Sequence, residues 1–192
     1  MYMYIVANDS ASFYMWFVAG SVSGFTFLDN RLYVVCHCKI HVFPADTFSE
    51  ISAITVDGLQ YPADIVACHD DCQLYVSDLG RSIWRVSAAN PTDYEEWLMD
   101  ESFNGFSTLS LTSRRLLMTT MMLYTALWAR SSLRQYSTVN KELLRVVELS
   151  DLLKTPTHAV ETSHGTFVIS HTGPSAVSEL FSFIICLLVL YL

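Results

Sequence analysis

One pattern occurs four times in this chain, as Arg31-Leu32-Tyr33-Val34, Gln73-Leu74-Tyr75-Val76, Arg115-Leu116-Leu117-Met118 and Thr166-Phe167-Val168-Ile169. Each copy is one polar residue followed by three apolar residues, which is typical of a short buried β-strand. The leading apolar residues stand at positions 32, 74, 116 and 167, so the spacings are 42, 42 and 51 residues. The last spacing is longer because residues 119–131 have no counterpart in the other units. The chain is therefore a repeat protein with a period of 42 residues.

Three further strands recur in phase with these cores. A second strand follows each core, at residues 40–43, 83–86 and 133–136, and a third at residues 51–56, 94–98 and 143–149. A fourth precedes the next core, at residues 65–67, 109–111 and 159–161. Four short strands per repeat predict an all-β fold, a β-propeller of four-stranded antiparallel blades. Helical periodicity is confined to residues 123–129 and 149–153, where we expect short helices.

Composition excludes several classes of protein. Hydrophobic residues make up 52% of the 192 residues and charged residues 16%, which excludes a disordered tail or a low-complexity linker. The net charge is −8, and the few basic residues form no cluster. Because an acidic chain repels phosphate, we expect no nucleic-acid partner.

The charges divide the chain into three parts. Residues 1–28 and residues 172–192 hold one charge each, Asp9 and Glu179, whereas residues 29–171 have an ordinary soluble composition. We expect residues 29–171 to form the propeller blades. Residues 1–28 are then an apolar N-terminal segment that can supply extra strands, and residues 172–192 an apolar C-terminal tail. The period predicts about three full blades and a partial one, a truncated propeller with its ends packed on the edges. A fragment of a larger propeller and a dimer are the alternatives.

The two ends also bear on location. No Lys or Arg precedes the apolar run at residues 13–19, so it matches a secretory signal poorly. The apolar run at residues 180–192 is shorter than the roughly 20 residues of a membrane-spanning helix. Membrane insertion of this tail is an alternative that we do not favour. The five cysteines are an odd number, which favours reduced thiols, and we favour a cytoplasmic location.

Residues 60–87, QYPADIVACHDDCQLYVSDLGRSIWRVS, resemble an NHL-type propeller repeat. The residues that carry the resemblance are Pro62, Asp64, Ile65, Ala67, Leu74, Tyr75, Val76, Asp78, Gly80, Ile83 and Val86. The resemblance covers most of residues 25–171, although the first and third blades match only in hydrophobic pattern. Residues 156–171 resemble the start of another blade. NHL-like repeats imply a module for protein–protein interaction.

Asp78 stands at the end of its predicted strand, just before the turn Leu79-Gly80-Arg81. An Asp in this position accepts backbone N–H groups of a turn. We expect its carboxylate to bind the backbone of that turn.

Two side chains near the predicted central channel are candidate metal ligands. Asp64 and His158 occupy the same repeat position, two residues after Pro62 and Pro156, and the third blade offers Ser107 or Thr108 there. The arrangement is similar to that of propeller lyases and lactonases, including the peptide-amidating lyases with axial histidines. Glu161 and His171 lie further along the strands. A catalytic zinc ion normally binds three protein ligands and keeps one position open, so these residues predict no catalytic site.

The cysteines are the other candidate ligands. Cys36-His37-Cys38 lies on a predicted strand, with both sulfurs on one face, and Cys68 and Cys72 flank a loop. Together with His41 they could supply a zinc site of thiolates and imidazoles. The spacing is not that of a known zinc knuckle, so we expect buried free thiols instead.

No G-x-S-x-G motif and no glycine-rich phosphate loop is present. The resemblance to NHL repeats implies a non-catalytic protein–protein interaction module that binds another protein through its propeller loops, and the lack of a complete catalytic constellation agrees with it. We expect no cofactor. Candidate anchors for the partner are Tyr61, Arg81 and Tyr94. The alternative is a metal-dependent propeller hydrolase or lyase with an axial site near Asp64 and His158.

Overall fold

A computed structural model describes residues 3–6, 13–16, 22–47, 49–78, 82–99, 106–121, 131–149, 156–171 and 184–186. All elements in these residues are β-strands. Within them there is no helix long and apolar enough to cross a membrane. Of the helices expected at residues 123–129 and 149–153, the first, and all of the second except residue 149, lie outside the described residues.

The strands form five antiparallel sheets, and four of these are the blades. Blade 1 consists of β3 (Val22–Leu28), β4 (Arg31–Cys36), β5 (Lys39–Pro44) and β6 (Ser52–Thr55). Blade 2 consists of β7 (Pro62–Cys68), β8 (Gln73–Asp78), β9 (Ser82–Ser87) and β10 (Tyr94–Met99). Blade 3 consists of β11 (Phe106–Thr112), β12 (Arg115–Met121), β13 (Ser132–Ser137) and β14 (Leu143–Glu148). Blade 4 consists of β15 (Pro156–Glu161), β16 (Phe167–His171) and β17 (Ile184–Cys186).

The remaining sheet pairs β1 (Met3–Val6) with β2 (Phe13–Trp16). Both strands lie in the N-terminal segment, residues 1–28, and so does β3, which is the first strand of blade 1. In the C-terminal tail, β17 pairs with β16.

The predicted strands are confirmed in every blade. Each four-residue core forms the second strand of its sheet, as β4, β8, β12 and β16. The strand that the repeat arithmetic placed before each later core is the first strand of the sheet, as β7, β11 and β15. The 42-residue period is thus the length of one blade with its connections.

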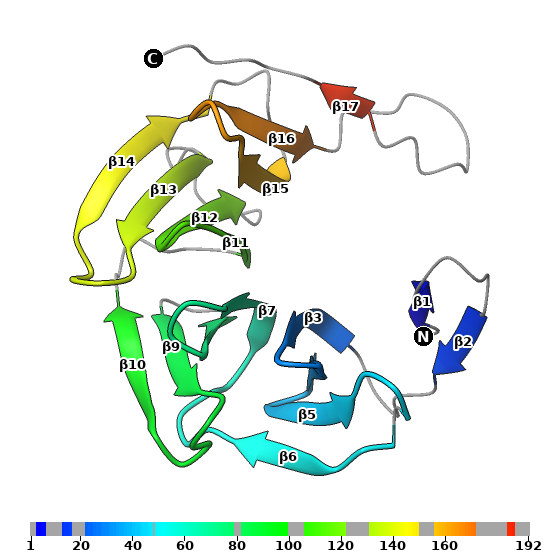
Figure 1. The fold of residues 1–192 in the computed structure, drawn as a ribbon. Coiled ribbons are helices and arrows are strands. Elements are labelled where there is room, and N and C mark those ends of the chain that lie inside the picture. The colour runs from blue at the N-terminus through cyan, green and yellow to red at the C-terminus, as the bar shows by residue number, and fades with distance from the viewer. Residues whose placement is uncertain are drawn as a thin grey trace.

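The first strands of consecutive blades lie against each other: β3 against β7, β7 against β11, and β11 against β15. Figure 1 shows the sheets arranged around a common centre, with these inner strands nearest to it. Four antiparallel sheets in this arrangement form a β-propeller that is partial, because the fourth sheet has three described strands.

Apolar residues fill the space between blades. One buried cluster, which includes Val35, Ile65 and Val76, joins blades 1 and 2. A second, which includes Tyr75, Leu109 and Met118, joins blades 2 and 3. A third, which includes Leu117, Ala159 and Phe167, joins blades 3 and 4. Side chains alternate between the two faces of a strand, so each inner blade buries both of its faces.

The antiparallel order gives every blade two ends. We call the end at which the inner strand begins the upper end, and the end at which it finishes the lower end. In blade 2, Pro62, Asp78, Ser82 and Met99 pair in one row at the upper end. Loops 69–72 and 88–93 lie at the lower end.

Candidate functional site

The inner strands place four residues at one equivalent position. The register pairs Asp64 with Ser77 and His158 with Ser170. Each stands three residues before the residue that pairs with the leading apolar residue of the core, Leu74 in blade 2 and Phe167 in blade 4. The same position holds Gly24 in blade 1 and Thr108 in blade 3. Asp64 and His158 therefore occupy matching places near the centre, and Thr108, one of the two alternatives, is their counterpart in blade 3.

Asp64 is bound between blades. Its Oδ2 accepts a hydrogen bond from the backbone N–H of Leu109 on β11 at 2.9 Å, and its Oδ1 accepts one from the N–H of Ile65 at 2.8 Å. Burial raises the pKa of Asp64, while the two backbone N–H groups and the charge of His158 lower it. Because both carboxylate oxygens already hold backbone donors, Asp64 acts as a link between blades 2 and 3.

Glu161 takes part in a different contact. It lies on β15, but its Oε2 accepts a hydrogen bond from Gln135 Nε2 on β13 at 2.8 Å, and its Oε1 lies 3.3 Å from Arg115 Nη1 on β12. Its side chain is only 1% exposed. Glu161 thus links blade 4 to blade 3.

Among the described residues, no group of three His, Cys, Asp or Glu side chains could hold a metal ion. The structure therefore does not bring Asp64, His158 and Glu161 together as one ligand set. The side chain of His171 lies outside the described part of the chain.

The four cysteines whose side chains are described also form no such group. The prediction that Cys36, His37 and Cys38 share a strand is wrong: β4 ends at Cys36, and His37 adopts a φ of 55° in the turn that follows. The thiols of Cys36 and Cys68 are buried as expected, but the expectation is wrong for Cys38, which is exposed, and for Cys72, which is half-buried. Burial raises the pKa of the Cys68 thiol to about 11. Such a thiol stays protonated at neutral pH and is a poor metal ligand. His41 Nδ1 pairs with Glu50 at 2.8 Å.

The predicted partner anchors do not share a face. Tyr61 stands just before β7 at the upper end of blade 2, and Tyr94 begins β10 at the lower end. Tyr61 is 63% exposed, whereas the Tyr94 ring lies 6.4 Å from Trp84 and packs on the cluster between blades 1 and 2. Arg81 lies outside the described residues. Of the two described anchors, Tyr61 is the one available to a partner.

The loop that carries Tyr61 is held in place by Asp78. Asp78 Oδ2 accepts the backbone N–H of Gln60 at 2.9 Å, and its Oδ1 accepts that of Tyr61 at 2.6 Å. The Cys38 thiol donates to the carbonyl oxygen of Gln60 at 2.9 Å. The turn at residues 79–81, where we expected the Asp78 carboxylate to bind, lies outside the described residues. Among the described residues, the Asp78 carboxylate fixes the loop before β7, which the sequence did not indicate.

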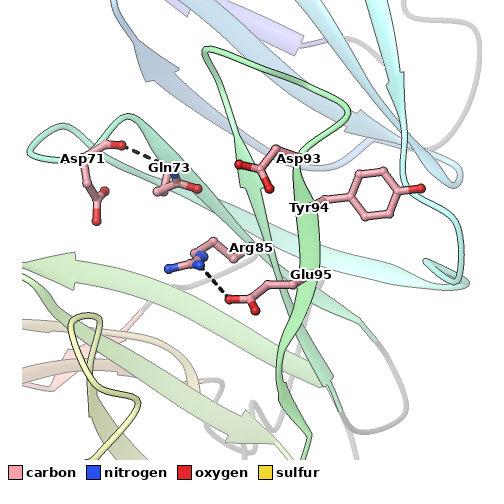
Figure 2. Close-up of a pocket in the computed structure, with 6 residues that line it drawn as sticks. All are labelled: Asp71, Gln73, Arg85, Asp93, Tyr94 and Glu95. Atoms are coloured by element: carbon pink, nitrogen blue, oxygen red, sulfur yellow. Dashed lines mark hydrogen bonds and ion pairs between the residues drawn. The ribbon is translucent and has the colours of Figure 1, made fainter.

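A polar pocket lies at the lower end of blade 2. It has a volume of about 220 Å³ and is lined by Asp71, Gln73, Arg85, Asp93, Tyr94 and Glu95 (Figure 2). We call it the blade-2 pocket. In Figure 2 the carboxylates of Asp93 and Glu95 lie on the same side of β10 as Arg85, and the Tyr94 ring points away from them. Tyr94 therefore contributes to the wall of the pocket while its ring packs elsewhere.

The charges of the blade-2 pocket are only partly balanced. Arg85 Nη2 lies 2.8 Å from Glu95 Oε1, and Lys141 Nζ lies 3.4 Å from the same oxygen. Asp70, the neighbour of Asp71 in the sequence, pairs with Arg114 at 3.3 Å. No cation lies within ion-pair distance of Asp71 or Asp93 among the described residues. The pocket has an excess of negative charge.

Sequence reasoning missed this pocket, apart from Tyr94. Two of its acidic residues, Asp71 and Asp93, come from loops and are 22 residues apart, and the third, Glu95, lies on β10. The predicted antiparallel pairing was the signal that could have found it. In an antiparallel sheet, strands two places apart run in the same direction, so the residues that precede them lie at the same end of the sheet.

No family model matches the chain, and no curated protein matches it. Several solved structures are similar to this chain. Kuenenia stuttgartiensis hydrazine synthase matches with a TM-score of 0.73 and 13% identity over 91% of this chain and 51% of that chain. The WD40 β-propeller domain of Doa1 matches with a TM-score of 0.61 and 14% identity over 79% of this chain and 48% of that one.

A third match is the β-propeller domain of Myceliophteria thermophila Cps50 (Swd1), with a TM-score of 0.57 and 9% identity. It covers 83% of this chain and 54% of that one. The chain thus spans about half the length of each of these three structures. At these identities the likeness concerns the fold, and it agrees with the blades described above: the chain has the fold of a β-propeller, in part.

Proposed function

We propose that this chain is a non-catalytic module of NHL-like propeller repeats that binds another protein through loops at its blade ends. The observation that carries the proposal is the Tyr61 loop. It presents a large exposed aromatic ring on a backbone that donates two hydrogen bonds to Asp78 and accepts one from Cys38.

A fixed loop favours binding for a physical reason. Ordering a mobile loop upon association costs free energy, and a loop that is already ordered avoids that cost. Tyrosine is also among the residues most enriched at the energetic centres of protein interfaces.

The blade-2 pocket suggests the chemistry of the partner at the lower end. Asp71 and Asp93 lack cationic partners among the described residues, and the chain carries a net charge of −8. A Lys or Arg side chain of a partner protein would balance this charge inside a pocket of suitable size. Support for protein binding also comes from two of the matched structures, which are propeller domains, one of them of the WD40 type.

The test is quantitative capture from a cell extract with the full chain immobilised. Tyr61→Ala should remove a defined set of captured proteins, because the ring is lost and the fold is unchanged. Val139→Ala is the matched control, since Val139 is 70% exposed on another blade. Proteins captured equally by wild type, Tyr61→Ala and Val139→Ala would argue against a role for the Tyr61 loop.

An enzyme remains the alternative that must be tested directly. Asp64 uses both carboxylate oxygens on backbone N–H groups, which leaves His158 without a second free ligand from its matched position. Metal content after dialysis, measured for wild type, Asp64→Ala and His158→Ala, separates the two functions. Stoichiometric metal that is lost in both variants, with turnover of an ester, lactone or peptide, would overturn the binding-module proposal.

A further inference from the structure

The contact between consecutive blades is a repeated interface with a fixed direction. Each inner strand sends one residue toward the next blade: Gly24 meets Asp64, Asp64 accepts from Leu109, and Thr108 Oγ1 donates to the carbonyl oxygen of Thr157 at 2.9 Å. The same blades send apolar residues back toward the preceding blade, at Ile65, Leu109 and Ala159. The interface is therefore heterologous, since one kind of face always meets the other kind.

We call the side of a blade that carries these apolar residues its backward face. In blade 1, part of the backward face is exposed. Ile65, Leu109 and Ala159 are 3%, 3% and 1% exposed, but Phe25, at the equivalent position of β3, is 48% exposed. Phe27 on the same face is 38% exposed. Leu32 and Val34 on β4, which pair with these two residues, are buried. The exposed part of the face is thus the inner strand, where the blades of this chain meet one another.

In blade 4, part of the opposite face is exposed, which is the face that contacts the next blade in blades 1 to 3. Val160 on β15 is 41% exposed, whereas Ser110, its equivalent on β11, is buried and donates to the carbonyl oxygen of Ala159 at 2.7 Å. Val168 and Ser170 on β16 are partly exposed, whereas the corresponding Leu117 and Thr119 of blade 3 are buried. Blade 4 therefore presents the face that, in blades 1 to 3, receives the next inner strand.

We propose that a second copy of this chain closes the propeller, with β3 of each copy seated against β15 of the other. Both faces belong to one molecule and continue an interface that the molecule already makes three times between its own blades. With four blades in each copy, the closed ring holds eight, at the upper end of the range of roughly four to eight found in propellers.

A closed pair also buries the apolar side chains that an open array of blades leaves exposed at its two ends. Exposed apolar side chains on the inner strands of the first and last blades, Phe25 and Phe27 on β3 and Val160 on β15, favour association. A heterologous contact gives a ring if its rotation closes and an open filament if it does not. Two equivalent contacts per pair bury Phe25 and Phe27 of both copies.

The test is sedimentation velocity of the full chain over a range of concentrations. We expect a dimer of twice 21.7 kDa. Phe25→Asp combined with Phe27→Asp, and separately Val160→Asp, should each weaken the dimer by about tenfold or more, because each change alters one face of both contacts. Val139→Asp is the control, since Val139 is exposed in the loop at residues 138–142 of blade 3, away from both faces. Circular dichroism checks that every variant stays folded.

Mixing the two variants gives a sharper result. In the mixture one contact joins two unaltered faces, so a dimer should return, weaker than that of the wild type. A contact between two identical faces would instead leave either the Val160→Asp variant or the Phe25→Asp, Phe27→Asp variant fully dimeric. That outcome, a wild-type chain that is monomeric at every concentration, or growth beyond two copies would overturn the proposal.

Discussion

Asp64 and Leu109 join two blades of this propeller through one hydrogen bond, in which the backbone N–H of Leu109 donates to Asp64 Oδ2 at 2.9 Å. The bond connects the inner strands β7 and β11 near the centre of the array (Figure 1). A side chain that the repeat position marked as a candidate metal ligand is therefore part of the contact between blades.

Asp64→Ala should lower the free energy of unfolding by about 1–3 kcal/mol, because two backbone N–H groups in a partly buried place lose their acceptor. Asp64→Asn should cost less, since its amide oxygen can still accept one of these bonds. Asp57→Ala is the control, because Asp57 is exposed in a loop, and it should change stability by less than about 0.5 kcal/mol. Urea denaturation measures all three, and equal values for Asp64→Ala and Asp57→Ala would contradict the role of Asp64.

Asp64 should also make stability depend on pH. Its pKa in the folded chain is raised above the ordinary value of 3.8, mainly by burial, so the folded chain binds the proton more tightly than the unfolded chain does. Its contribution is then fully present below 3.8 and is lost as pH rises through the raised pKa. The stability of wild type minus that of Asp64→Asn should fall as pH rises through this acid range. A difference that is constant or rises with pH would show that burial does not dominate.

The fold could be predicted from the sequence because the period of a repeat survives changes in its residues. Leu32, Leu74 and Leu116 are 42 residues apart, and each lies on the second strand of its blade. The end of β4 could not be predicted, because Cys36, His37 and Cys38 continue the alternation of the strand. Only the positive φ of His37 shows that the chain has already turned.

The candidate site was harder to predict for a different reason. Equivalent repeat positions correctly matched Asp64 with His158, but the partner of each side chain depends on how closely adjacent blades approach. Glu161 illustrates this, since its carboxylate reaches Gln135 and Arg115 on another blade. The blade-2 pocket depends likewise on two loops that only the folded sheet brings together.

Gly24→Ala should destabilise the fold by about 1–3 kcal/mol through crowding between blades 1 and 2. A Cβ at this position would lie 2.7 Å from Asp64 Oδ1 and 3.0 Å from both Asp64 Cα and the backbone nitrogen of Ile65. Backbone atoms cannot move aside as a flexible side chain can, so β3 must shift. Ser23→Ala, next to it and exposed, is the control. In a Gly24→Ala, Asp64→Ala double variant the two costs should be less than additive, because the closest atom is gone; full additivity would argue against the contact.

Arg115→Met should cost more than Glu161→Gln, although each change removes the same ion pair. Without Arg115 the Glu161 carboxylate stays buried with only Gln135 as a partner, and an uncompensated buried charge is costly, here about 2 kcal/mol because Arg115 is itself 40% exposed. Glu161→Gln removes the charge while its amide oxygen can still accept from Gln135, so the cost should be about 1 kcal/mol. The double variant should be no less stable than Arg115→Met alone.

A surface pair of the same length provides the control for this last comparison. Arg114 Nε and Asp70 Oδ2 are also 3.3 Å apart, but the two side chains are 50% and 58% exposed. Arg114→Met should therefore cost less than about 0.5 kcal/mol, because water screens the pair and solvates the freed carboxylate. Denaturation of the four variants in parallel tests whether burial decides the cost. If Arg115→Met and Arg114→Met are equally stable, the Glu161 carboxylate reaches water in solution and does not tie blade 4 to blade 3 as a buried charge.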